Sequence, residues 1–196
     1  MARPRKITVE QILNAAQAIF LEKGFGASTQ EIATKAGISE GSIFKRFATK
    51  EELFIAAMGA SKISSVTSFI EATAGQDDLR ENLKKIGLEM VDFIRELLPR
   101  MMMVRSKGVP LPPMLMQPSK APPVRVVKAL TELFEQEISL GRMRCSHPET
   151  IAMMFLGAVM QYVFFVQASA QLPDAEVYID SVVDVFWGSI QPNDET

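Results

Sequence analysis

Apolar residues recur along this chain at intervals of three and four, the spacing that places side chains on one face of an α-helix. Alternating apolar and polar runs, which indicate strands, are nearly absent. The sequence therefore predicts an all-α protein of about nine helices. We expect these near residues 9–23, 29–36, 40–47, 50–72, 79–97, 100–105, 124–140, 148–170 and 173–190.

Residues 8–54 are dense in helix start and stop signals. A Ser or Thr followed three residues later by Glu or Gln is the spacing of a capping box, in which the two side chains bind backbone N–H groups that lack helical partners. Gly37 suits a tight turn between two short helices, and Ser39 can start the second. The capping pairs are Thr8–Gln11, Ser28–Glu31 and Thr49–Glu52.

Two short helices joined by a tight turn form a helix-turn-helix, which reads DNA by laying its second helix in the major groove. The motif needs an apolar underside and a polar outer face. Both are present in the segment 29–47. The underside consists of Ile32, Ala33, Ile38, Ile43 and Phe47.

The segment ISEGSIFKRFATKEELF, with IFLEKGFGASTQEIATKAG before it, resembles the DNA-binding domain of the TetR/AcrR family of bacterial transcriptional repressors. The resemblance covers about residues 7–54, and beyond residue 60 it extends only to the helix layout. It implies a three-helix DNA-binding head at 1–54, with the fourth helix continuing to about 72. It also implies a ligand-binding and dimerisation domain at 55–196.

The same resemblance implies which residues contact DNA. Where family members often carry tyrosine, this chain has Phe44, which cannot bind a phosphate through a hydroxyl but can pack or contact a thymine methyl. Lys45 and Arg46 add charge that can replace the lost contact. The implied contacts to bases or backbone are Thr29, Gln30, Glu40, Gly41, Ser42, Phe44, Lys45 and Arg46, with a phosphate contact from Lys50.

The net charge of −2 conceals an asymmetry between the two ends of the chain. Residues 1–50 contain eight Lys/Arg and four Asp/Glu, a charge of about +4, whereas the remainder carries about −6. This charge pattern is typical of a protein whose basic N-terminal part contacts phosphates while its acidic remainder does not. The arm formed by Arg3, Arg5 and Lys6 either reaches a groove or phosphates, or is a solvated tail.

The sequence contains few of the residue patterns that are typical of enzyme active sites. A single histidine, His147, leaves no Ser/His/Asp set, and no Gly-rich phosphate loop is present. The lone Cys145 excludes an internal disulfide and, with one histidine, a Cys/His metal cluster, so we expect neither metal nor cofactor. Arg142 and Arg144 make the surroundings of Cys145 basic, which leaves a thiol-based redox sensor as a minor alternative.

The sequence favours a cytoplasmic protein. MARPRKITVEQ is charged and leads directly into an amphipathic helix, unlike a signal peptide. Residues 151–166 form the most apolar stretch, but they are interrupted by Gln161 and are shorter than a bilayer span requires. We expect a buried helix there.

The two helices predicted at 148–170 and 173–190 are apolar on nearly every face. Such helices must be buried, either inside the chain or, as we favour, in a homodimer. A dimer also matches an inverted-repeat operator, because it sets two recognition helices roughly 34–36 Å, or a multiple, apart.

Methionine and aromatic residues concentrate in the predicted body, where flexible thioethers can line an adaptable apolar site. With the family resemblance, this predicts a pocket for a small apolar or aromatic effector that releases a repressor from its operator. A DNA-binding activator or architectural protein without a ligand is the alternative. The Pro-rich residues 108–123 are expected to be a long connecting loop. The expected ligand contacts are Met90, Phe93, Met102, Met103, Met154, Phe155 and Tyr162.

Overall fold

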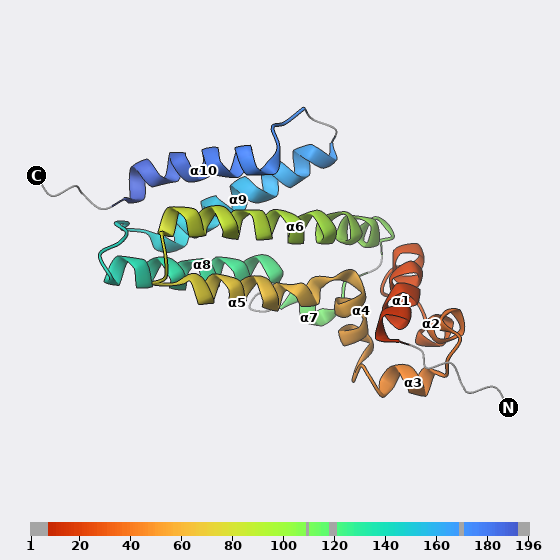
Figure 1. The fold of residues 1–196 in the computed structure, drawn as a ribbon. Coiled ribbons are helices and arrows are strands. Elements are labelled where there is room, and N and C mark those ends of the chain that lie inside the picture. The colour runs from red at the N-terminus through yellow and green to blue at the C-terminus, as the bar shows by residue number, and fades with distance from the viewer. Residues whose placement is uncertain (1–7, 109, 118–120, 169–170, 192–196) are drawn as a thin grey trace, which may run out of the picture. The chain divides into compact units, whose positions relative to one another are not determined.

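The computed structural model describes residues 8–108, 110–117, 121–168 and 171–191, and within these ranges all regular structure is helical, as Figure 1 shows. The predicted all-α fold is confirmed. The α-helices are α1 (Val9–Lys23), α2 (Thr29–Ala36), α3 (Glu40–Phe44), α4 (Lys50–Met58), α5 (Ile63–Thr73), α6 (Leu79–Ser106), α7 (Pro113–Met116), α8 (Pro122–Ser139), α9 (Pro148–Gln167) and α10 (Ala175–Ile190), and a 3-10 turn, η1, spans Ala60–Lys62.

The chain forms two compact units. The head unit comprises Met1–Ser61 and Glu96–Pro118, and the body unit comprises Lys62–Arg95 and Ser119–Thr196. Helix α6 therefore contributes residues to both. The DNA-binding domain proposed from sequence at 1–54 lies within the head unit, which also contains a second, distant segment of the chain.

The capping boxes predicted at the starts of α1 and α2 are present. The Thr8 hydroxyl accepts from the N–H of Gln11 at 3.2 Å, and the Gln11 side chain accepts from the N–H of Thr8 at 3.0 Å. At α4 the pattern differs, because Glu52 accepts from the N–H of Ala48, one residue before the cap Thr49, at 2.7 Å. These local bonds fix where the head helices begin.

The head core is built around three phenylalanines. The Phe20 and Phe54 ring centroids are 5.0 Å apart, and those of Phe25 and Phe54 are 5.3 Å apart, both pairs in edge-on geometry. Val104, near the end of α6, is fully buried in the same cluster. Partly buried Met101, Leu111 and Leu115 pack against it, so the segment after residue 96 completes this core.

In the body unit, α8 packs against both α5 and α9, and α10 packs against α9 (Figure 1). Helix α6 packs closely against α9 and α10 at the buried Gly87. A Cβ atom at that position would lie 2.7 Å from Cγ2 of Ile179 in α10 and 3.4 Å from the Phe155 ring in α9. Crowding between helices therefore favours glycine at 87, whereas its backbone conformation does not.

The helix expected at 50–72 is interrupted, which corrects the sequence reading. Helix α4 ends at Met58 and is capped by Gly59, whose φ of 82° lies in the left-handed region that glycine adopts without steric cost. Its N–H donates to the carbonyl of Ala56 at 3.1 Å. The apolar spacing continues past this point, but the backbone hydrogen bonds of the helix do not.

The break expected at Pro99, between a helix at 79–97 and a short segment at 100–105, is also wrong. Helix α6 continues through Pro99 to Ser106. Proline removes one helical hydrogen bond, to the carbonyl of Arg95, at a cost of about 3 kcal/mol. We attribute the continuation to the burial of Val104 beyond it. The division of α6 between the two units falls between Arg95 and Glu96.

Other boundaries differ by a few residues. Helix α3 ends at Phe44 rather than at 47, and the Pro-rich segment contains the one-turn helix α7, with Pro113 at its first position. Pro122 likewise begins α8. Proline suits these positions because the first helical N–H groups have no helical acceptor.

Candidate nucleic-acid interface

The short helix α3 lies on the surface of the head unit, anchored by one side. Ile43 is fully buried and Phe47 nearly so, whereas Phe44, Lys45 and Arg46 are exposed. Phe44 has 43% of its surface exposed, a large apolar group facing solvent within a basic stretch. Lys45 and Arg46 follow the helix as a turn rather than continuing it. The arrangement can present cations and one aromatic ring to a polyanion.

The turn that leads into α3 depends on Gly37. Its φ of 70° and ψ of 33° are left-handed, and the next N–H, from Ile38, donates back to the carbonyl of Ala33 at 3.0 Å. Ile38 is thereby directed toward the head core. Gly41, on α3 itself, has no such requirement, because a Cβ there would meet no atom within 4 Å. Nothing within the described chain explains glycine at position 41.

The polar side chains of the interface bind one another. The Thr29 hydroxyl donates to Oε1 of Glu40, linking the first residues of α2 and α3. The Ser39 and Ser42 hydroxyls lie 2.8 Å apart, so Ser39 does not cap α3 through its side chain. Arg46 donates to the Ser42 carbonyl at 3.1 Å. No local pattern in the sequence predicts the link between Thr29 and Glu40, because the two residues belong to different helices.

Lys50 stands at the first position of α4, where exposed helix N–H groups favour anions. Its Nζ lies 4.7 Å from the centroid of the Phe25 ring. Burial lowers the pKa of Lys50, while the ring face is a favourable neighbour for the charged ammonium. Gln30 is exposed beside Thr29 on α2. The arm residues Arg3, Arg5 and Lys6 lie outside the described residues.

The residues predicted to contact an effector are distributed over both units. Met90, Phe93, Phe155 and Tyr162 are buried in the body unit, while Met154 is exposed there. The exposed Met102 and Met103 belong to the head unit.

Tyr162 has clear structural partners in the body. Its hydroxyl donates to the Pro173 carbonyl at 3.0 Å, and its ring stacks on Tyr178 with 4.6 Å between centroids. It also borders a surface hollow of about 570 Å³ that Arg95 and Leu172 line. Tyr162 can therefore contact a ligand only while its hydroxyl remains bonded to Pro173 and its ring remains stacked on Tyr178.

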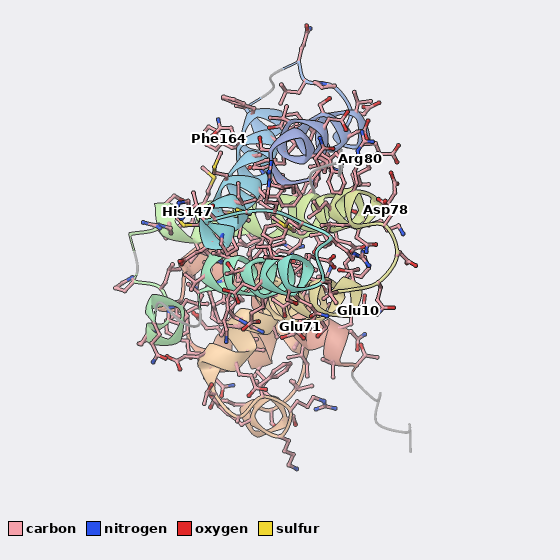
Figure 2. The ribbon with its side chains drawn as sticks, turned by 90° about the vertical axis from the view of Figure 1, so that its left-hand side faces the viewer. Glu10, Glu71, Asp78, Arg80, His147 and Phe164 are labelled. Carbon is pink, nitrogen blue, oxygen red and sulfur yellow. The ribbon has the colours of Figure 1, made fainter. Side chains whose placement is uncertain are left out.

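One face of α9 is apolar and exposed in the single chain, so the helix is not buried on all sides within the chain itself. Figure 2 shows Phe164 on the outer side of this helix, and α10 adds Val185, whose surface is 76% exposed. By length and composition alone α9 is also the one helix among the described residues that could cross a bilayer, though soluble core helices pass the same criterion. The exposed apolar residues of α9 are Met153, Met154, Met160, Phe164, Phe165 and Val166.

Cys145 is half-buried beside a hollow of about 530 Å³ that is also lined by Arg144, His147 and Thr150. Its Sγ accepts from the N–H of His147 at 3.2 Å. Among the residues that the structure describes, no group of three His, Cys, Asp or Glu side chains is placed to hold a metal ion.

Two family profiles match this chain. Residues 12–57 match bacterial regulatory proteins of the tetR family, and residues 81–189 match the C-terminal domain of AefR-like transcriptional repressors. YvkB, an uncharacterised HTH-type transcriptional regulator of Bacillus subtilis, is 40% identical over 81 residues, 41% of each chain. FasR, an HTH-type transcriptional activator of Mycolicibacterium smegmatis, is 30% identical over 92 residues, 46% of this chain and 42% of FasR. The chain thus spans less than half the length of these curated relatives.

Solved structures share the fold along nearly the whole chain. A TetR-family regulator of Mesorhizobium loti, itself assigned only provisionally, superimposes with a TM-score of 0.70 at 20% identity, covering 93% of this chain and 96% of that one. SmeT, the repressor of the Stenotrophomonas maltophilia multidrug efflux pump SmeDEF, superimposes as its triclosan complex with a TM-score of 0.69 at 21% identity, covering 94% and 92%. At such identities the likeness establishes the fold alone.

Proposed function

Because this chain belongs to the TetR family of bacterial transcriptional regulators, we propose that it is a repressor that leaves a palindromic operator when a small apolar molecule binds its body unit. The observation that carries the DNA-binding part is the exposed basic stretch of Lys45 and Arg46 held by the buried Ile43. The match to AefR-like repressors supports repression. The family consists of regulators rather than enzymes, and we place this protein in the cytoplasm.

DNA binding is tested first by charge removal. We expect Lys45→Ala with Arg46→Ala to weaken binding to a selected operator by about 1–3 kcal/mol per lost base contact. The control is Lys85→Ala with Lys128→Ala, which removes the same charge from the body unit. Fluorescence-anisotropy titration at fixed salt measures both. Equal affinities for the two double variants would contradict the assignment.

Gly41→Ala separates folding from DNA contact more sharply. A methyl group at this position meets no atom of the chain within 4 Å, and alanine favours a helix over glycine by about 1 kcal/mol. We therefore expect unchanged or raised thermal stability together with weaker operator binding, because the added methyl stands where DNA would approach. Undiminished operator affinity would remove Gly41 from the interface.

A second copy of this chain is the proposed occupant of the exposed face of α9 and α10, since family members are dimeric. Val185 is three-quarters exposed, so Val185→Asp should leave the isolated fold intact. We expect it to convert dimers to monomers in analytical ultracentrifugation and to weaken operator binding. The control is Val124→Asp, an exposed valine on α8. A wild-type protein that sediments as a monomer would contradict the proposal.

Release by a ligand requires that the effector bind two states of the protein with different affinity. Helix α6 is the element shared by both units, with Met90 buried in the body and Val104 buried in the head core. We propose that an effector contacting Phe93 and Phe155 biases this helix. The SmeT complex with triclosan concerns SmeT, and here it indicates only that this fold can hold a small molecule.

Linkage provides the test of release. The compound is first found by screening for molecules that raise the melting temperature of the protein. It must then weaken operator binding, and operator DNA must weaken binding of the compound by the same factor. The activator reading is kept open by the similarity to FasR. Transcript levels separate the two, because deletion of a repressor raises a target transcript whereas deletion of an activator lowers it.

A further inference from the structure

We propose that Glu40 selects a cytosine in each operator half-site by accepting a hydrogen bond from the N4 amino group, while Thr29 holds the carboxylate in position. The inference rests on the proposed DNA-binding function and adds the base that this surface reads. It assigns Glu40 a specificity role and Thr29 a positioning role.

The geometry points to an oriented carboxylate rather than a mobile one. Glu40 is the first residue of α3 and is half-buried, and Thr29 is the first residue of α2. The Thr29 hydroxyl donates to Oε1 of Glu40. That bond leaves Oε2 available as an acceptor and removes side-chain freedom that binding would otherwise have to restrict.

A carboxylate in this position is informative because it is unfavourable for general DNA affinity. Phosphates repel it, whereas Lys45 and Arg46 in the same motif attract them. In the first turn of α3 the carboxylate also stabilises the helix N-terminus, so its contribution toward DNA is discrimination between bases rather than affinity. In the major groove guanine presents only acceptors, and thymine presents an acceptor and a methyl group. Adenine presents its N6 donor beside the N7 acceptor, which repels a carboxylate, whereas cytosine presents the N4 donor that Asp and Glu accept. A fixed Glu40 therefore favours cytosine and repels guanine at the same position.

Selection of half-sites from random duplex DNA tests this with the whole 196-residue chain. Wild type should enrich one position for cytosine. Glu40→Gln should lose that preference by about 5–150-fold and move it toward adenine, the base that glutamine binds in a bidentate manner, with the other positions unchanged. The same variant should bind duplexes lacking the site more tightly than wild type, because a negative charge has been removed.

Two further variants make the test specific. Thr29→Val keeps the shape but removes the hydroxyl, so it should weaken the cytosine preference at that position and nowhere else. Glu22→Gln removes an exposed charge from α1 and should leave the selected sequence as in wild type. Circular dichroism checks that every variant is folded.

The outcomes are distinguishable from failure of the proposed function. If wild type enriches no sequence, DNA-specific regulation itself fails. If wild type enriches a half-site that Glu40→Gln leaves unchanged at every position, the role of Glu40 is overturned and the regulator remains. If Thr29→Val selects as wild type does, positioning by Thr29 is overturned. A shift of equal size in Glu22→Gln would show a general charge effect and would also overturn the inference.

Discussion

The buried carboxylate of Glu137 holds the turn between α5 and α6 against the end of α8. Removing its partner, Arg142, should cost more stability than removing the charge of Glu137 itself. Glu137 is 0% exposed. Its Oε1 accepts from the N–H of Gly75 at 2.7 Å, and its Oε2 lies 2.8 Å from Nε of Arg142 in an ion pair that lacks the alignment of a hydrogen bond. Arg142 also donates to the carbonyls of Gln76 at 3.0 Å and Asp77 at 2.6 Å. These bonds tie three parts of the body unit together.

The magnitudes follow from which group each substitution leaves behind. Arg142→Met leaves the Glu137 carboxylate buried without a counter-ion, and breaking such a pair costs about 3–5 kcal/mol. Because the Arg142 side chain is 31% exposed, some solvent reaches it, and we expect the lower end, about 3 kcal/mol. Glu137→Gln keeps an oxygen for the N–H of Gly75 and leaves a partly solvated cation, for a cost of about 1–2 kcal/mol.

The double variant Arg142→Met with Glu137→Gln is the decisive case. It leaves no buried charge, so it should be more stable than Arg142→Met alone, although two groups have been changed. Urea unfolding followed by the fluorescence of the single tryptophan, Trp187 in α10, reports on the body unit. Arg144→Met, an exposed neighbour, is the control. Equal costs for the two single variants, or additive costs in the double variant, would refute this account.

Three further substitutions test the packing of each unit. Val104→Ala should destabilise the head unit by about 2 kcal/mol, because apolar surface is no longer buried. The loss should appear as faster amide hydrogen exchange in α1 and α4. Unchanged exchange in these helices would contradict the place of Val104 in the head core. Gly59→Ala should lower the free energy of unfolding by more than about 1 kcal/mol, because φ is 82° and the new Cβ would lie 2.8 Å from Nη1 of Arg100. A wild-type melting temperature would refute this. Gly87→Ala should cost about 1–3 kcal/mol by urea unfolding through overlap with Ile179, and a wild-type midpoint would show that α10 can shift at no cost.

Interactions between residues close together along the chain can be predicted from the sequence, whereas those between distant residues cannot. Thr8 and Gln11, or Ser28 and Glu31, are three residues apart, so their capping bonds can be recognised in the chain and are present in the structure. The bond between Gly75 and Glu137 spans 62 residues, and no periodicity announces it. The same distinction explains why local sequence patterns do not predict the link between Thr29 and Glu40, although both residues belong to the predicted interface.

The amino-acid sequence alone determined the all-α class, the starts of the head helices and the helix-turn-helix with its turn at Gly37, because caps, turns and amphipathic faces arise from neighbours a few residues apart. Only the tertiary structure decided that α6 passes through Pro99 and that Val104 completes the head core. Local rules favour ending a helix at proline, whereas burial of distant side chains can outweigh one lost hydrogen bond. That balance depends on contacts between segments far apart in the chain, which hydrophobic spacing does not encode.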